Sequence, residues 1–155
     1  GPAAYAAEYA YLWESSGALA RQLATFSAAV FDRFMERPDA RVWVAQTGDV
    51  IVGFLTMIVG SVDPIEKRAN GAEIPRIYLL PGSQGHGIGR QLVERAIAKA
   101  REERMSYVWL DVMASADRAR SAYLRWGFTE LGTKRFARPV RSGLADMIVF
   151  AKTIG

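Results

Sequence analysis

The sequence predicts an α+β domain built on one mixed β-sheet. Residues 41–60 contain two β-forming segments joined by a turn of hairpin length, which is typical of antiparallel strands. Residues 73–113 have the pattern of a strand, an amphipathic helix and a strand, and such a βαβ unit normally joins parallel strands. The last two strand segments also form a predicted hairpin, so we expect a mixed sheet that is mostly antiparallel.

The chain of 155 residues is long enough to bury a full hydrophobic core, and we expect one domain over residues 1–155. Half of the residues are apolar and 23% are charged, which is typical of a soluble protein. Gly1-Pro2 is typical of a scar left by tag removal. No apolar run approaches the roughly 20 residues of a membrane span, and no secretory signal is visible, so we expect a cytoplasmic protein without a membrane partner.

The residue types exclude several kinds of chemistry. Cysteine is absent, so a disulfide framework, a cysteine metal site and a cysteine nucleophile are all excluded. With a single histidine in the chain, we expect no metal site. The net charge is +4, but basic residues are scattered among acidic ones without an aromatic-basic motif, so we expect no nucleic-acid partner.

The first half of the chain contains both helical and strand patterns. Apolar residues at steps of three and four predict a helix that begins after Gly17 and ends at Pro38-Asp39. In chain order, this half is predicted to form a helix over 3–14, the helix after Gly17, strands over 41–46 and 50–60, an exposed loop over 61–71 and a strand over 73–80. Pro75 indicates an irregularity or a bulge in that last strand.

The second half begins with an amphipathic helix from Ile88 to about Arg104. A short helix follows later in the chain, with Asp117 as its expected amino-terminal cap and Gly127 as its carboxyl-terminal cap. The remaining predicted elements are strands over 106–113, 128–136 and 145–154, with a basic loop over 137–143.

A glycine-rich segment, Gln84–Arg90, joins the strand over 73–80 to the helix that follows it. Glycines at every second position leave the backbone almost bare, and the start of a helix presents unpaired N–H groups with a partial positive charge. This arrangement predicts a phosphate-binding site. A P-loop is excluded because Ile88 stands where its lysine should follow. A dinucleotide fingerprint is excluded because its third glycine would fall at Arg90 or Leu92.

The pattern that does fit is Q-x-x-G-x-G at Gln84, Gly87 and Gly89, between a strand and a helix. It resembles the acetyl-CoA loop of the GNAT superfamily of N-acetyltransferases. A second segment, with Ala119, Tyr123 and Gly127-Phe128, resembles the downstream pattern of the same superfamily. The element order from residue 17 onward is also similar to that fold, whose helices and sheet form α/β/α layers.

The resemblance implies acetyl-CoA as co-substrate and assigns roles to residues near the loop. Backbone amides of the loop would bind the pyrophosphate, and the two central parallel strands would splay apart to admit the cofactor. Tyr123 would protonate the departing thiolate. The implied cofactor-binding residues are Leu79, Leu80, Gln84, Gly85, His86, Gly87, Ile88, Gly89, Arg90 and Ala119. Ala116 departs from the family pattern, which often has an asparagine at that position to contact CoA.

Acetyl transfer to an amine benefits from a base, because alkyl ammonium groups have pKa values of roughly 10. Glu73 is the candidate, since its place on the strand before the loop resembles that of the catalytic glutamate in many GNAT enzymes. Asp111, inside the next strand, is the alternative. On a regular strand, Glu73, Ile77 and Leu79 point to the same face.

The sequence therefore predicts direct transfer of an acetyl group to the amine of a small molecule or a peptide. The last hairpin is basic and would suit an amine that also bears an anionic group, through Lys134, Arg135, Arg138 and Arg141. A non-catalytic CoA-binding or sensing domain is the alternative function. The resemblance also makes a homodimer plausible.

Overall fold

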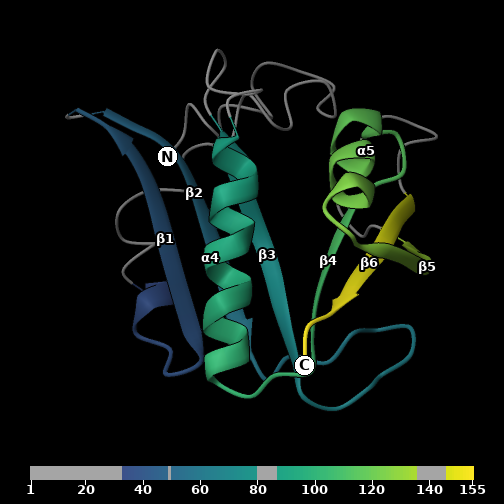
Figure 1. The fold of residues 1–155 in the computed structure, drawn as a ribbon. Helices are drawn as coiled ribbons and strands as arrows, with labels where there is room; N and C mark the ends of the chain where they lie inside the picture. The colour runs from purple at the N-terminus through teal and green to yellow at the C-terminus, as the bar shows by residue number, and fades with distance from the viewer. Residues whose placement is uncertain (1–32, 49, 80–86, 136–145) are drawn as a thin grey trace. The chain divides into compact units, whose positions relative to one another are not determined.

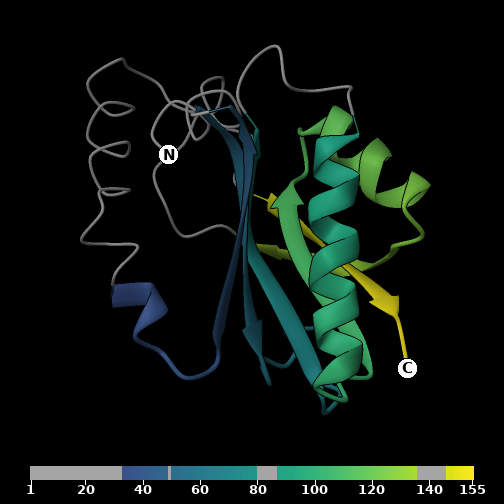
Figure 2. The ribbon, with the colours of Figure 1, turned by 60° about the vertical axis from the view of Figure 1, so that its left-hand side comes forward.

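The computed structural model describes residues 33–48, 50–79, 87–135 and 146–155. Their arrangement is shown in Figure 1 and, turned by 60°, in Figure 2. The elements are β1 (Ala40–Thr47), β2 (Val50–Val59), β3 (Gly71–Leu79), α4 (Ile88–Glu102), β4 (Tyr107–Met113), α5 (Asp117–Arg125), β5 (Thr129–Arg135) and β6 (Asp146–Thr153).

The strands form one six-stranded sheet in the order β1-β2-β3-β4-β6-β5. Strand β3 pairs parallel with β4, whereas β4 with β6 and β5 with β6 pair antiparallel. The predicted α+β fold with a mixed sheet is confirmed, and so is the βαβ unit. The registered parallel pairs run from Gly71–Tyr107 to Glu73–Trp109, at the amino-terminal ends of both strands.

The chain divides into two compact units. The first unit comprises residues 1–57 and 76–96, and the second comprises residues 58–75 and 97–155. In the first unit, strand β2 approaches β3 so closely that a Cβ atom on Gly53 would lie 2.8 Å from the carbonyl oxygen of Tyr78. The rings of Phe54 and Tyr78 then meet edge to face at a centroid distance of 5.0 Å. Glycine at position 53 therefore permits the close contact of the two strands.

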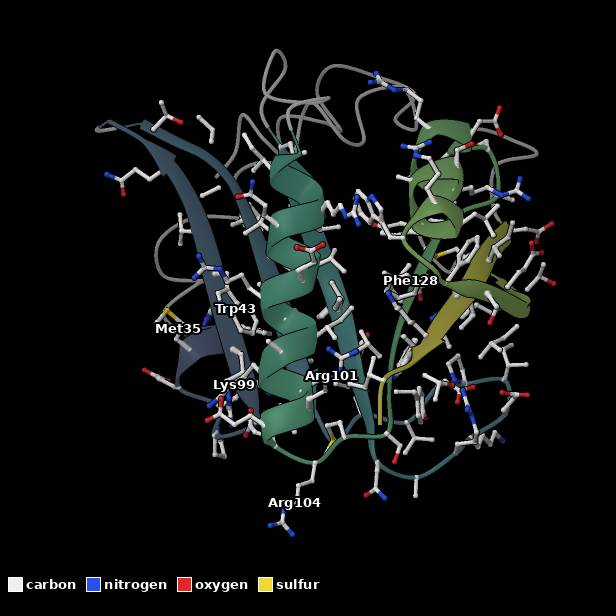
Figure 3. The ribbon with its side chains drawn as sticks, in the orientation of Figure 1. Met35, Trp43, Lys99, Arg101, Arg104 and Phe128 are labelled. Carbon is white, nitrogen blue, oxygen red and sulfur yellow. The ribbon has the colours of Figure 1, made fainter. Side chains whose placement is uncertain are left out.

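In the second unit, β4 is the central strand and is buried on both faces. Its antiparallel partner β6 has the predicted apolar run, with five consecutive buried residues from Met147 to Ala151. Helix α5 covers one face of this part of the sheet, because the ring of Tyr123 packs against that of Phe150 on β6. Figure 3 shows Phe128 between α5 and the β5–β6 hairpin, where its side chain is fully buried.

Most predicted boundaries agree with the structure to within two residues. Of the helix predicted from after Gly17 to Pro38, the structure describes residues 33–37, and of these only 33–35 are helical. Its earlier residues lie outside the described residues, as do the helix predicted over 3–14 and the loop over 137–143. Strand β3 begins two residues earlier than predicted, at Gly71. A Cβ atom there would lie 2.6 Å from the Tyr107 ring, so the pairing of β3 with β4 needs glycine at this position. Sequence patterns treat glycine as a strand breaker, and the predicted strand therefore began later.

Strand β3 runs from Gly71 to Leu79 with Pro75 inside it. In the part that belongs to the second unit, Ala72 and Ile74 are buried and Glu73 between them is partly buried, so Glu73 points to the face opposite to theirs.

The prediction that Asp117 caps α5 was wrong. Ala116 occupies the N-cap position and makes no side-chain capping bond, while Asp117 is the first helical residue and is exposed. The chain enters the helix through a turn in which the Ala116 N–H donates to the Met113 carbonyl, and this turn moves the helix start by one residue. The predicted carboxyl-terminal cap is confirmed: Gly127 has φ 91°, and bonds from Gly127 N to Leu124 O and Phe128 N to Tyr123 O end the helix.

Candidate active site

The phosphate-loop candidate is described only in part, from Gly87 onward, and belongs to the first unit. Gly87 has φ 78°, a conformation that other residues rarely adopt, and its carbonyl accepts the N–H of Gln91 at 3.0 Å. Ile88 is the first residue of α4, and Gly89 is buried. The first turn of α4 holds no acidic residue, so the positive end of this helix is not neutralised by its own side chains.

Arg90 is exposed and forms an ion pair with Glu94 one turn later, at 3.0 Å. Leu79, the last residue of β3, is partly buried. Leu80, Gln84, Gly85 and His86 lie outside the described residues.

Glu73, the candidate base, is partly buried in the second unit. The hydroxyl of Ser61 donates a hydrogen bond to its Oε1 atom at 2.8 Å. Glu73 also forms the last registered parallel pair with Trp109 on β4. Its side chain therefore lies on the same face of the sheet as the Trp109 indole.

Asp111, the alternative base, is occupied by a partner. The Lys134 ammonium on β5 lies 2.5 Å from its Oδ2 atom and 6.0 Å from the centroid of the Trp109 ring. This ion pair joins β4 to β5.

Tyr123, the candidate acid, is buried on α5 among aromatic rings. Its ring centroid lies 5.6 Å from that of Trp126, 5.7 Å from that of Phe128 and 6.1 Å from that of Phe150. These contacts fix the direction of the phenol. Ala119, one turn earlier, is partly buried.

Glu73 and Tyr123 lie on opposite faces of the second unit's sheet. Trp109 pairs with Ala151 and Leu110 pairs with Phe150, so the Trp109 face and the Phe150 face alternate along both strands. Glu73 shares the first face and Tyr123 packs on the second.

Sequence patterns missed a group of residues around Glu73: Ser61, Asp63, Tyr107 and Trp109. The predicted exposed loop is confirmed at Val62 and over 64–70, but Asp63 within it is fully buried. The pair Asp63-Pro64 was the available signal, because an aspartate before a proline often begins a turn by bonding later N–H groups. The hydrogen bonds that join this loop to Tyr107 and Trp109 on β4 had no signal in the neighbouring sequence.

Two pKa values in this group differ from their ordinary values. Burial raises the pKa of Asp63, but hydrogen bonds from the Glu66, Lys67 and Ile65 amides outweigh burial, and the pKa is lowered overall. Burial raises the pKa of Tyr107, and the nearby Asp63 carboxylate adds to that rise. Asp63 is therefore ionised and Tyr107 neutral at physiological pH.

Within the described ranges, no cluster of three or more histidine, aspartate or glutamate side chains could hold a metal ion. No helix in those ranges is long and apolar enough to cross a membrane.

Comparison with known proteins identifies the family to which this chain belongs. The profile of the Acetyltransferase (GNAT) family matches residues 6–128, and the chain belongs to this family. It thus has the fold and the sequence signature of an acetyltransferase.

Individual relatives are also named as N-acetyltransferases. An uncharacterised N-acetyltransferase of Lactobacillus delbrueckii subsp. lactis is 36% identical over 86 residues, which cover 56% of this chain and 50% of that protein. The [ribosomal protein bS18]-alanine N-acetyltransferase of Escherichia coli is 32% identical over 83 residues, covering 54% of this chain and 56% of that protein. The chain thus spans only about half the length of these curated relatives.

Solved structures show the same fold. The crystal structure of the Escherichia coli ribosomal-protein-S18-alanine N-acetyltransferase has a TM-score of 0.69, with 24% identity, over 99% of this chain and 87% of that chain. An N-acetyltransferase of Thermoplasma acidophilum, solved in complex with coenzyme A, has a TM-score of 0.72, with 19% identity, over 98% and 87% of the two chains.

Proposed function

We propose that this chain transfers the acetyl group of acetyl-CoA directly to a primary amine, in a ternary complex and without a covalent enzyme intermediate. The observation that carries the proposal is the Glu73 carboxylate, which a hydrogen bond from Ser61 orients on the sheet face opposite to Tyr123. Membership of the acetyltransferase family supplies the type of reaction.

The proposed reaction uses one base and one acid. The neutral amine attacks the thioester carbonyl carbon, a C–N bond forms, and the C–S bond then breaks. Glu73 accepts the proton that the nitrogen loses, directly or through a water molecule. Tyr123 gives its phenol proton to the sulfur, so CoA leaves as the thiol. Exchange with solvent returns a proton to Tyr123 and removes one from Glu73, so that protons balance over the cycle.

The described part of the phosphate loop fits an anionic co-substrate. The bare backbone at Gly87 and Gly89, and a helix start without acidic side chains, suit the pyrophosphate of CoA. We propose that amides from Gln84 to Arg90 bind this pyrophosphate and that the backbone of Leu79 and Leu80 pairs with the pantetheine arm. Ala119 would contact the cofactor from α5.

The acceptor is an amine of a peptide or of a small molecule. The name of the Escherichia coli relative, which acts on an alanine of a ribosomal protein, supports a peptide amino terminus as one class. The predicted preference for an anionic acceptor was based on four basic residues of the last hairpin. Lys134 is already paired with Asp111, so the preference now depends on the positive charges of Arg135, Arg138 and Arg141.

Two measurements on the purified chain test the proposal. Calorimetry would show whether acetyl-CoA binds, and a thiol-release assay would show turnover. The assay panel is an alanine-initiated hexapeptide, alanine amide, aspartate and spermidine. We expect binding and turnover of at least one amine. Binding without turnover would favour the non-catalytic CoA-binding function, and absence of binding would contradict both functions. A large preference for spermidine would contradict an anionic acceptor.

A further inference from the structure

The Ser61 hydroxyl lies at hydrogen-bond distance from Glu73 although the two residues are on different elements. Ser61 follows β2 directly, and Glu73 lies in β3. We propose that Ser61 is a positioning residue for Glu73. Three further residues hold Ser61 and its loop in place: Asp63, Tyr107 and Trp109. The inference rests on the proposed function, in which Glu73 is the base.

The backbone on both sides of Ser61 is fixed. The Gly60 N–H donates to the Gly71 carbonyl at 2.8 Å, and the Trp109 indole N–H donates to the Ser61 carbonyl at 2.8 Å. Two residues later, the Asp63 N–H donates to the Tyr107 hydroxyl at 3.1 Å. A serine with this many bonds around it holds its side chain in a narrow range of directions.

The loop that follows is closed on itself by Asp63. One carboxylate oxygen of this buried residue accepts the amides of Ile65 at 3.0 Å, Glu66 at 2.6 Å and Lys67 at 3.3 Å. The Tyr107 hydroxyl donates to the Arg68 carbonyl at 2.5 Å, and the Arg68 guanidinium lies 4.3 Å from the centroid of the same ring. The loop is therefore held by hydrogen bonds at Asp63 and Tyr107, although residues 64–70 are exposed.

Gly71 completes the support, because it lets the loop approach β4. A Cβ atom at this position would lie 2.6 Å from both the Ser61 carbonyl oxygen and the Tyr107 ring. Two residues further along β3 comes Glu73, in register with Trp109, which also holds Ser61. Both ends of the Ser61–Glu73 hydrogen bond are thus tied to the same residue of β4.

The hydrogen bond has two consequences for a base. It restricts a side chain with three rotatable bonds to the direction that the substrate needs. It also favours the charged carboxylate over the neutral acid, because a hydroxyl donates more strongly to an anion. In the described part of the second unit, the charged groups on or beside this sheet face include Asp63 next to Tyr107, Asp111 and Lys134, which pair with each other, and Arg68 over the Tyr107 ring.

The direct test is a pH titration of the Glu73 carboxyl by ¹³C NMR in protein labelled at glutamate, with the resonance assigned through Glu73→Gln. In Ser61→Ala we expect the midpoint to move to higher pH by roughly half a unit. Ser61→Thr keeps the hydroxyl and should keep the midpoint. Ser106→Ala, at an exposed serine, is the matched control. An unchanged midpoint in folded Ser61→Ala would overturn the proposal.

If Ser61→Ala does not fold, Trp109→Phe serves instead, because it removes the indole N–H and keeps an aromatic ring. We expect a smaller change in the same direction, and an unchanged midpoint would again overturn the proposal.

Kinetics separate this inference from the proposed function. The variant is assayed with an amine of the panel that the wild-type protein acetylates. In the pH profile of kcat, the acid limb of Ser61→Ala should move to higher pH, and kcat should fall roughly 10-fold. Full kcat with an unchanged limb would contradict the inference alone. If the wild-type protein acetylates no amine, the proposed function fails, while the NMR titration still decides whether Ser61 acts on Glu73.

Discussion

Among single residues, the candidate acid and the candidate base are held by different kinds of force. Tyr123 is fixed by packing, with three aromatic rings around it. Glu73 is oriented by a hydrogen bond from Ser61. Packing depends on the shape of the ring, whereas the proton-transfer role depends on the hydroxyl alone. The two properties of Tyr123 can therefore be separated by one substitution.

Tyr123→Phe keeps the ring and removes the hydroxyl. We expect kcat to fall by roughly 10²-fold, because the thiolate then leaves without a proton donor. The acetyl-CoA dissociation constant from calorimetry should stay within about threefold of wild type, since the aromatic packing remains. Tyr123→Ala, which also removes the ring, should unfold at a clearly lower temperature. A Tyr123→Phe variant with wild-type kcat would show that this phenol is not the acid.

Among the elements, helices α4 and α5 end with the same pattern of hydrogen bonds but with different residues at the position of positive φ. At the end of α5, Gly127 has φ 91°, and at the end of α4, Arg104 has φ 66°. Bonds from Arg104 N to Arg101 O and from Met105 N to Ala100 O repeat the pattern seen after α5. A side chain at positive φ costs about 1 kcal/mol, and glycine avoids this cost.

Arg104→Gly should therefore raise the free energy of unfolding by about 0.5–1 kcal/mol in urea titrations at pH 7. Figure 3 shows the Arg104 side chain pointing away from the ribbon, so little packing is lost. Arg104→Ala is the matched control, since it removes every side-chain atom beyond Cβ and keeps the Cβ at positive φ. Equal stability of the two variants would contradict this account of the helix end.

The loop between β2 and β3 depends on the ionised form of Asp63. Its pKa is lowered in the folded protein, so its contribution is complete above the unfolded pKa of about 3.9 and is lost as the pH falls through the folded value. Asp63→Asn should lower the free energy of unfolding by about 2 kcal/mol at pH 7. The difference from wild type should shrink at pH 3, measured by urea titration. A difference that does not depend on pH would be inconsistent with this charge.

For the whole molecule, sequence patterns predicted much of the fold because its signals are local. The helical stripe from Leu92 to Ala100 and the hairpin turn at Gly48 lie within short segments, and both are confirmed. Motif spacing also indicated Glu73 and Tyr123 as site residues, and their roles remain predictions. One domain over residues 1–155 likewise stays a prediction, and a single unfolding transition would support it.

What the sequence could not predict depends on contacts between distant segments. The bond from Asp63 to the Tyr107 hydroxyl joins residues 44 positions apart, and that from Trp109 to Ser61 joins residues 48 apart. The Asp63-Pro64 pair indicates a turn, but no local pattern shows that the Asp63 carboxylate is buried. The close approach at Gly71 is equally invisible, because glycine by itself indicates a break in a strand.

The central claim is that Glu73 is the base of an acetyl transfer, and Glu73→Gln tests it most directly because glutamine keeps the shape of the side chain and cannot accept the proton. The measurement is kcat by thiol release at pH 7.5 with the best panel amine, alongside the acetyl-CoA dissociation constant from calorimetry. We predict a fall in kcat of roughly 10²-fold or more with an unchanged dissociation constant. A Glu73→Gln variant that keeps wild-type kcat would contradict the claim.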